Sequence, residues 1–143
     1  MQLPSNVGDD HGSVMKGWFV APATTNYRFY MSCDDSCRLN LGNTPNNAED
    51  TTEINYNGEV SKIIPKPDFN DVRNFWDVLE YESNPTTISD WIALEKGEHY
   101  FIEGHHLEWR YADHFSVAVE IEATSEVAEG HHQSMKEIQK LTV

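Results

Sequence analysis

The chain has 143 residues, which is enough for one domain with a single hydrophobic core and too few for two. Hydrophobic residues make up 38% and aromatic residues 11% of it, so the composition excludes a wholly disordered protein. The chain carries 10 Lys and Arg against 24 Asp and Glu, and its net charge of -14 argues against nucleic acid or anionic lipid as partners. No apolar run is long enough for membrane insertion. The excess carboxylates favour solubility and also attract cations, calcium above all.

The first part of the chain shows the alternation that is typical of strands. Apolar residues at every second position predict strands at residues 16–21, 26–32 and 37–41. The residues 34–36 separate the second strand from the third and predict a three-residue hairpin tip.

The middle of the chain is less regular. A polar stretch at residues 43–57 predicts a long surface loop that holds a short strand at 53–56. Two prolines exclude a central strand at 63–67, which we expect to be a connector. The pattern then predicts a strand or helical turn at 75–81, an extended apolar segment at 88–94 and a tight turn at 95–98.

Two further strands are predicted at residues 100–109 and 115–121. Seven to nine short strands separated by turn signals indicate an all-β fold, an antiparallel sandwich or barrel, over residues 1–122. The composition changes after that point. We expect residues 123–143 to be a linker followed by a terminal strand at 137–143.

This terminal strand has no obvious partner in its own domain, and a lone apolar strand is not stable in water. We therefore expect it to pair with a following domain of a larger chain, or with the sheet edge of a neighbouring copy by strand addition. Donation from head to tail between copies would build an open filament.

Two adjacent carboxylates, Asp34 and Asp35, stand at the predicted tip. Their repulsion is costly without a counter-charge, and a calcium ion that accepts hard oxygen ligands would offset it. Holding neighbouring Asp residues on one ion can require a cis peptide bond. The alternative is an ordinary turn in which both side chains are exposed to water.

Cys33 and Cys37 flank the Asp pair. Across a three-residue tip their Cα atoms would be close enough for a disulfide, an interpretation that we favour over two free thiols. Such a bridge would fix the shape of the tip, and it indicates an oxidising compartment.

The segment between the last two predicted strands mixes acids, imidazoles and aromatic residues. Trp109 and Tyr111 are suited to stacking on a sugar ring or anchoring a protein partner. Glu108 or Asp113 could supply a further calcium oxygen. The candidate ligand-binding residues are Trp109, Arg110, Tyr111 and Asp113. The alternative is a solvated loop with Trp109 packed on the edge of the core.

The chain shows no signature of an enzyme. His105 and His106 are adjacent, so in a strand they face opposite sides and chelate one metal poorly. The sequence holds no nucleophile elbow, no zinc-protease motif and no Gly-rich phosphate loop. A carboxylate pair acting on a glycan is the one catalytic option, and the spacing does not favour it.

Several motifs together resemble the protective-antigen-14 domain. They are GWFVAPATTNYRFY at residues 17–30, the Asp34–Asp35 pair, LNLG at 39–42, IALEKGEHYF at 92–101 and HFSVAV at 114–119. The resemblance spans about residues 12–122, with the motifs in the family's order. It is closest to extracellular proteins of the fibrocystin and fibrocystin-L type, and the same family includes the lectin domains of yeast flocculins.

The resemblance implies a β-sandwich that acts outside the cell or at the cell surface in carbohydrate binding, adhesion or assembly. In the flocculins the consecutive Asp pair binds calcium and the ion grips sugar hydroxyls, a role that falls here on Asp34 and Asp35. Those lectins add an Asn from the loop before the final strand, and Glu108 stands nearest to that position. We expect a non-catalytic module that binds glycans or glycoproteins with calcium. The alternative is a structural module of an extracellular stalk, fibre or receptor ectodomain that binds no sugar.

Overall fold

The computed structural model describes residues 1–57, 88–124 and 139–140. The predicted connector at 63–67, the predicted strand or turn at 75–81 and most of the predicted linker lie outside this part of the chain. Among the described residues, no helix is long and apolar enough to span a membrane.

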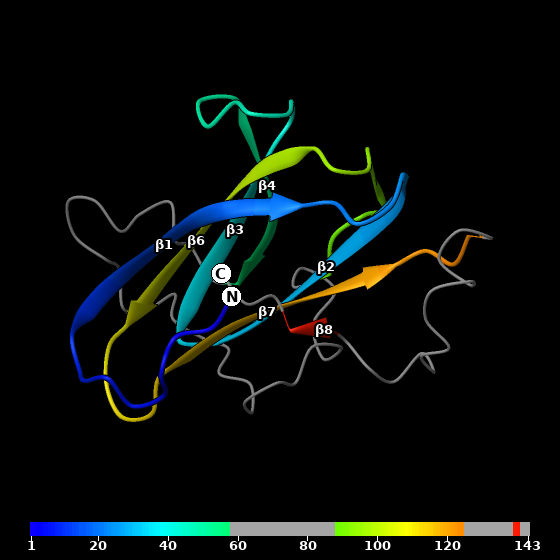
Figure 1. The fold of residues 1–143 in the computed structure, drawn as a ribbon. Coiled ribbons are helices and arrows are strands. Elements are labelled where there is room, and N and C mark those ends of the chain that lie inside the picture. The colour runs from blue at the N-terminus through cyan, green and yellow to red at the C-terminus, as the bar shows by residue number, and fades with distance from the viewer. Residues whose placement is uncertain (58–87, 125–138, 141–143) are drawn as a thin grey trace.

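In the described residues, eight strands form two antiparallel sheets that pack face to face (Figure 1). The first sheet has the order β1 (His11–Val20), β6 (His99–Glu108), β3 (Ser36–Gly42) and β4 (Thr51–Asn57). The second has the order β5 (Ile92–Leu94), β2 (Thr25–Asp34), β7 (His114–Ile121) and β8 (Gln139–Lys140). The predicted all-β antiparallel fold is confirmed, and of the two architectures that the turn spacing allowed, sandwich or barrel, it is the sandwich.

The hydrophobic core lies between the sheets and is built by alternate residues of each strand. Tyr27, Phe29 and Met31 of β2 are fully buried, as the alternation predicts. Phe19 of β1 meets the rings of Tyr27 and Phe29 edge to face, with 5.4 Å between ring centroids in each pair. Burying side chains of this size contributes roughly 1.5–3 kcal/mol each, so these aromatic residues dominate the core.

The predicted hairpin between β2 and β3 is wrong. The two strands belong to different sheets, because β2 pairs with β5 and β7 while β3 pairs with β4 and β6. Asp35 alone lies between them, so the Asp pair occupies a connection that crosses from one sheet to the other. Cys33 ends the apolar face of β2 and Cys37 begins that of β3, and both are fully buried. The chain crosses between the sheets here because the apolar faces of β2 and β3 must both point into the core between them.

Element boundaries differ from the prediction at several points. β1 begins at His11, ahead of the predicted strand at 16–21, and β4 extends the short strand predicted at 53–56. Only Ile92–Leu94 of the predicted extended segment forms a strand, although Ile88 makes an isolated bridge with Tyr30 of β2. Alternation marks the middle of a strand more reliably than its ends, because pairing with a distant neighbour decides where a strand stops.

The described part of the tail pairs within its own chain. Gln139 and Lys140 of β8 lie opposite Val119 and Ala118 of β7 in an antiparallel register. These residues extend the chain's own sheet, whereas the sequence indicated no partner there. The rest of the predicted strand at 137–143 lies outside the described residues.

The first residues of the chain run beside β7, an arrangement for which the sequence pattern made no prediction. The main-chain N–H of Leu3 donates to the carbonyl of Phe115, and the N–H of Val117 donates to the carbonyl of Met1, both at 2.9 Å. The Met1 side chain is buried in the core. This contact leads the following residues toward the end of the sandwich that carries the candidate site.

Candidate functional site

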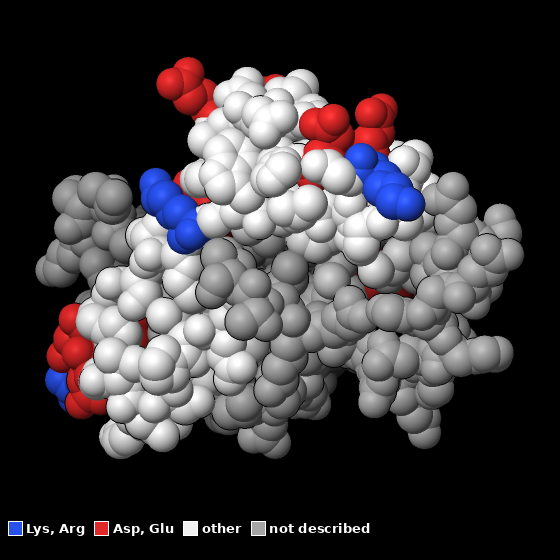
Figure 2. All heavy atoms as spheres, viewed as in Figure 1, with Lys and Arg blue, Asp and Glu red and all other residues white. Residues whose placement is uncertain are grey.

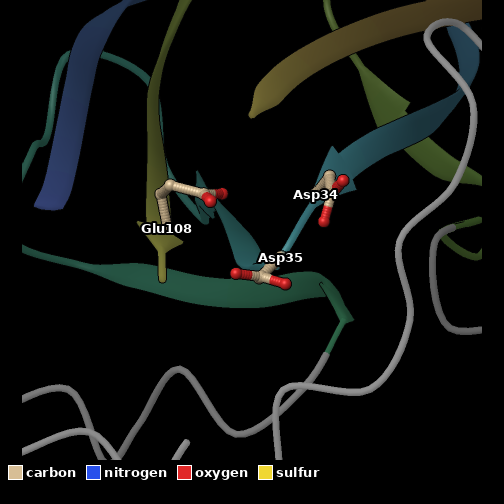
Figure 3. A group of neighbouring side chains, drawn as sticks. All are labelled: Asp34, Asp35 and Glu108. Atoms are coloured by element: carbon tan, nitrogen blue, oxygen red, sulfur yellow. The ribbon is translucent and has the colours of Figure 1, made fainter. Parts of the chain in front are cut away.

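Three carboxylate side chains meet at the end of the sandwich where β6 stops and β2 passes to β3 (Figure 3). Asp34 is the last residue of β2, Asp35 follows it in the connection, and Glu108 is the last residue of β6. One carboxylate oxygen from each lies within 4.8 Å of the others. The peptide bond between Asp34 and Asp35 is cis. The fold thus brings together the three residues that the sequence put forward as calcium ligands.

The electrostatics of this acidic cluster disfavour three negative charges. Burial raises the pKa of Glu108 from 4.5 to about 8, and the charges of Asp35 and then Asp34 add to the effect. Burial likewise raises the pKa of Asp34 from 3.8 to about 7, followed by the charge of Asp35 and a hydrogen bond with it. At neutral pH the cluster therefore needs either bound protons or a cation.

Glu108 supplies the observation that tests whether a cation fits. Its side chain is 0% exposed, and neither carboxylate oxygen has a hydrogen-bond partner among the described residues. A buried polar group without a partner costs about 1–3 kcal/mol, and more when it is charged. Calcium accepts carboxylate oxygens in flexible geometry, and the cluster holds no thiolate or imidazole that would favour zinc or copper. The donor set fits a hard divalent cation such as calcium.

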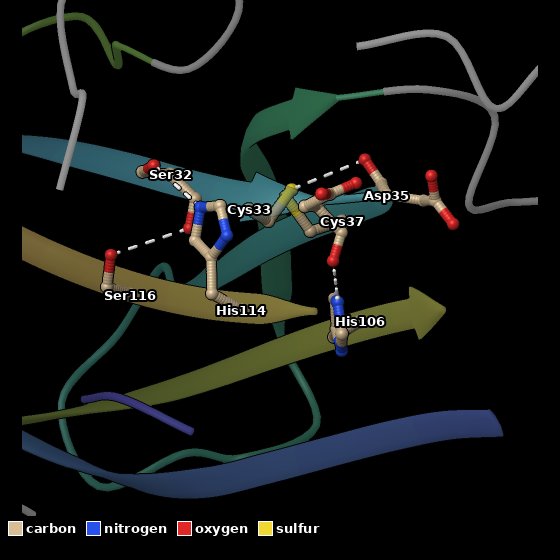
Figure 4. Close-up of a disulfide and its surroundings, with 8 residues drawn as sticks. Ser32, Cys33, Asp35, Cys37, His106, His114 and Ser116 are labelled. Atoms are coloured by element: carbon tan, nitrogen blue, oxygen red, sulfur yellow. Dashed lines mark hydrogen bonds between the residues drawn. A yellow bond between two sulfur atoms is a disulfide. The ribbon is translucent and has the colours of Figure 1, made fainter. Parts of the chain in front are cut away.

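The predicted disulfide is present and brackets the Asp pair (Figure 4). Cys33 and Cys37 are joined, with 6.3 Å between their Cα atoms, and both lie in the core. The bridge ties the end of β2 to the start of β3, and so limits how far Asp34 and Asp35 can move relative to the two sheets.

Two hydrogen bonds from β6 and the loop after it hold the Asp pair. His106 Nε2 donates to the main-chain carbonyl of Asp34 at 2.6 Å, and the buried ring packs against Phe115. The main-chain N–H of Trp109 donates to Asp35 Oδ2 at 2.8 Å. Both donors lie close to Glu108 on the chain, so β6 and the first residue after it supply one carboxylate and position the other two.

The prediction that adjacent histidines would diverge is confirmed. His106 faces the core and Asp34, whereas His105 points to the other face of the sheet and pairs with Glu103. The described residues therefore offer no joint metal site for these two rings.

The connection between β6 and β7, residues 109–113, is called the ligand loop below. Trp109 and Tyr111 are exposed, the latter to 88%, and the guanidinium of Arg110 lies 5.4 Å from the Trp109 ring centroid. The predicted ligand-binding side chains Trp109, Arg110 and Tyr111 thus stand at the surface, in the loop that directly follows Glu108.

Asp113 has a different setting from its loop neighbours. It is 3% exposed, its Oδ1 accepts the main-chain N–H of Val7 at 2.7 Å, and its Oδ2 lies 3.5 Å from His11 Nε2. These contacts bind the loop to Val7, which precedes β1, and to His11, the first residue of β1. Sequence reasoning missed the N-terminal contribution because 106 residues separate Val7 from Asp113 and no local pattern links them.

No family model matches the sequence, and no curated protein matches it. Among solved structures, the fold is similar to an adhesin domain. That structure is the A domain of epithelial adhesin 6 (Epa6A) from Candida glabrata, in complex with Galβ1-3GlcNAc. The TM-score is 0.52 at 15% sequence identity, and the match covers 82% of this chain and 46% of that one. The chain thus spans less than half the length of the adhesin chain, and the likeness is one of fold.

Proposed function

We propose that this chain is an extracellular adhesion module that binds glycans through a calcium ion held by Asp34, Asp35 and Glu108. The observation that carries the proposal is the buried Glu108 carboxylate, which has no hydrogen-bond partner among the described residues and lies against two further carboxylates. The disulfide supports an oxidising compartment such as the cell surface. The complex of Epa6A with a disaccharide supports a glycan as the ligand.

Each group has a distinct part in the proposed binding. The three carboxylates hold calcium, whose remaining coordination positions accept sugar hydroxyls. Trp109 and Tyr111 offer aromatic faces on which a sugar ring can stack, and Arg110 offers hydrogen-bond donors. The ligand loop follows Glu108 directly, and its first residue, Trp109, donates its main-chain N–H to Asp35, so the loop begins at the proposed ion site.

Calcium binding is tested by thermal unfolding with calcium and with a chelator. A ligand at one hundred times its dissociation constant stabilises the folded state by ~2.7 kcal/mol, which corresponds to a rise of several degrees. The double variant Asp34→Asn, Asp35→Asn is expected to lose this rise. The matched control is Glu49→Gln with Glu95→Gln, which removes two exposed charges away from the cluster. Equal melting temperatures of the native protein with calcium and with chelator would contradict the proposal.

Glycan binding is tested on a glycan array that includes Galβ1-3GlcNAc, probed with calcium and with chelator. We expect binding that requires calcium and is lost in the Asp34→Asn, Asp35→Asn variant. If the protein binds calcium but no glycan on the array, the alternative function is favoured. That alternative is a structural module of an extracellular stalk, fibre or receptor ectodomain. Fibrocystin-like architecture, pairing with neighbouring domains or copies, and filament formation stay predictions of that alternative.

A further inference from the structure

The residues that precede β1 lie against the ligand loop, although about one hundred positions separate them in the sequence. In Figure 1 the blue loop before β1 and the yellow loop between β6 and β7 run side by side at the lower left. Figure 2 shows acidic and basic side chains gathered over the same place. Residues 6–11, which precede β1 and include its first residue, His11, are called the N-terminal segment below.

Main-chain hydrogen bonds join the two segments at both ends of the ligand loop. The N–H of Asn6 donates to the carbonyl of Asp113 at 3.1 Å, and the N–H of Asp10 donates to the carbonyl of Trp109 at 2.7 Å. The Asp113 carboxylate adds its contacts with Val7 and His11. The loop is therefore held at its first and its last residue.

A side chain of the N-terminal segment holds the middle of the loop. Asp9 Oδ1 accepts the main-chain N–H of Tyr111 at 3.0 Å. Tyr111 has φ of 83°, in the left-handed region that a bulky residue rarely adopts, and its side chain is 88% exposed. This backbone conformation needs a compensating contact, and the Asp9 carboxylate supplies one.

We propose that Asp9 is a positioning residue of the ligand loop, and that it fixes the Tyr111 backbone so that the aromatic side chains face the sugar. This inference rests on the proposed glycan-binding function. A loop that is already ordered loses less conformational freedom when the ligand binds, so the affinity rises without a further contact to the sugar. The calcium ligands stand on β2, on β6 and in the connection to β3, and the hydrogen bond of Asp9 is made with the loop. The charge of Asp9 also acts on Glu108, where it is the smallest of the causes that raise the pKa, so the test must separate the charge from the hydrogen bond.

The test compares three variants of the full chain. Asp9→Ala removes the acceptor, and Asp9→Asn removes the charge but keeps an oxygen that accepts the Tyr111 N–H. Asp10→Asn is the control, because it removes the same charge from a side chain with no hydrogen bond or ion pair among the described residues. Asp9 and Asp10 are exposed, so all three variants should fold.

Two quantities are measured for each variant. The first is the hydrogen-exchange rate of the Tyr111 amide by NMR, which needs no glycan. The second is the affinity for Galβ1-3GlcNAc in excess calcium. We expect Asp9→Ala to speed the exchange and to weaken the disaccharide about fivefold, the factor that one net hydrogen bond represents. Asp9→Asn should restore both, and the affinity for calcium alone should be equal in Asp9→Ala and Asp9→Asn, because both variants lack the same charge.

Two results overturn the inference. One is an unchanged Tyr111 exchange rate in Asp9→Ala. The other is faster exchange with a disaccharide affinity equal to that of Asp10→Asn. A native protein that binds no disaccharide contradicts the proposed function instead, and the exchange rate then decides by itself whether Asp9 holds the loop.

Discussion

At the scale of single residues, Glu108 decides how the site behaves without a cation. Its carboxylate is fully buried, lacks a hydrogen-bond partner among the described residues and faces Asp34 and Asp35. A protein that kept this residue only for folding would gain from a neutral side chain of the same shape. The buried Glu108 carboxylate therefore lowers the stability of the folded protein, and this cost favours a role in binding over a role in folding.

Replacing Glu108 with Gln is expected to raise the melting temperature of the chelated protein by several degrees at about pH 9. Here the native carboxylate is ionised, whereas the amide carries no charge and donates to neighbouring carboxylates. At about pH 5 both side chains are neutral and the two proteins should melt alike. Differential scanning fluorimetry in chelator measures the difference, and a lower melting temperature of the variant at about pH 9 would contradict this account.

At the scale of elements, β6 carries the site and must also pack tightly along its inner face. Gly104 lies on this face, and a Cβ atom there would stand 2.7 Å from Phe115 Cζ and 2.9 Å from Phe115 Cε1. Real Cβ atoms do not approach other atoms so closely, so the ring of Phe115 must move if a side chain is added. That ring also packs against His106, which holds Asp34.

The Gly104→Ala variant should therefore be less stable by ~1–3 kcal/mol, the usual cost of overpacking a core. Gly12→Ala on β1 is the control, since the nearest atom to its added Cβ is 3.7 Å away. Urea unfolding of the two variants gives the comparison. Equal urea midpoints of the two variants would show that the Phe115 ring moves aside without a loss of stability.

The disulfide acts on the connection between β2 and β3. The chain-entropy relation gives ~2 kcal/mol for so short a closed loop, so the Cys33→Ala, Cys37→Ala variant should fold with a melting temperature several degrees lower. Its calcium affinity should fall as well, because the bridge fixes the strand ends on both sides of the Asp pair. Isothermal titration with calcium tests this, and native affinity in the variant would assign the bridge to stability alone.

Sequence reasoning predicted the elements better than their partners. Period-two alternation is local, so the buried face of Tyr27, Phe29 and Met31 could be predicted. Pairing between strands is not local, and the connection at Asp35 was mistaken for a hairpin tip. The proximity of Glu108 to the Asp pair was expected from a family resemblance, since more than seventy residues separate them and no periodicity joins them.

At the scale of the whole molecule, the net charge of -14 raises the question of how an acidic chain holds a buried acidic cluster. Surface carboxylates lie in water, where salt screens their repulsion. The cluster lies at one end of the sandwich, is partly or fully buried, and is screened much less. The pH dependence of stability should therefore report on the cluster more than on the surface.

The stability of the chelated protein should fall as the pH rises from about 5 to about 8. The folded pKa of Glu108 is about 8 and that of Asp34 about 7, above their ordinary values of 4.5 and 3.8. Between the ordinary and the folded pKa values, the unfolded chain releases protons that the folded chain keeps, so unfolding becomes more favourable as the pH rises.

Saturating calcium should flatten this dependence of stability on pH, because the cation stabilises the ionised carboxylates in the folded state. Melting temperatures measured across this range, with calcium and with chelator at high salt, test the argument. Burial lowers the pKa of His106, which offsets part of this fall because the unfolded chain binds a proton there that the folded chain does not. The deciding comparison is therefore with Glu108→Gln, and a variant whose pH dependence equals that of the native protein would show that Glu108 does not hold its proton.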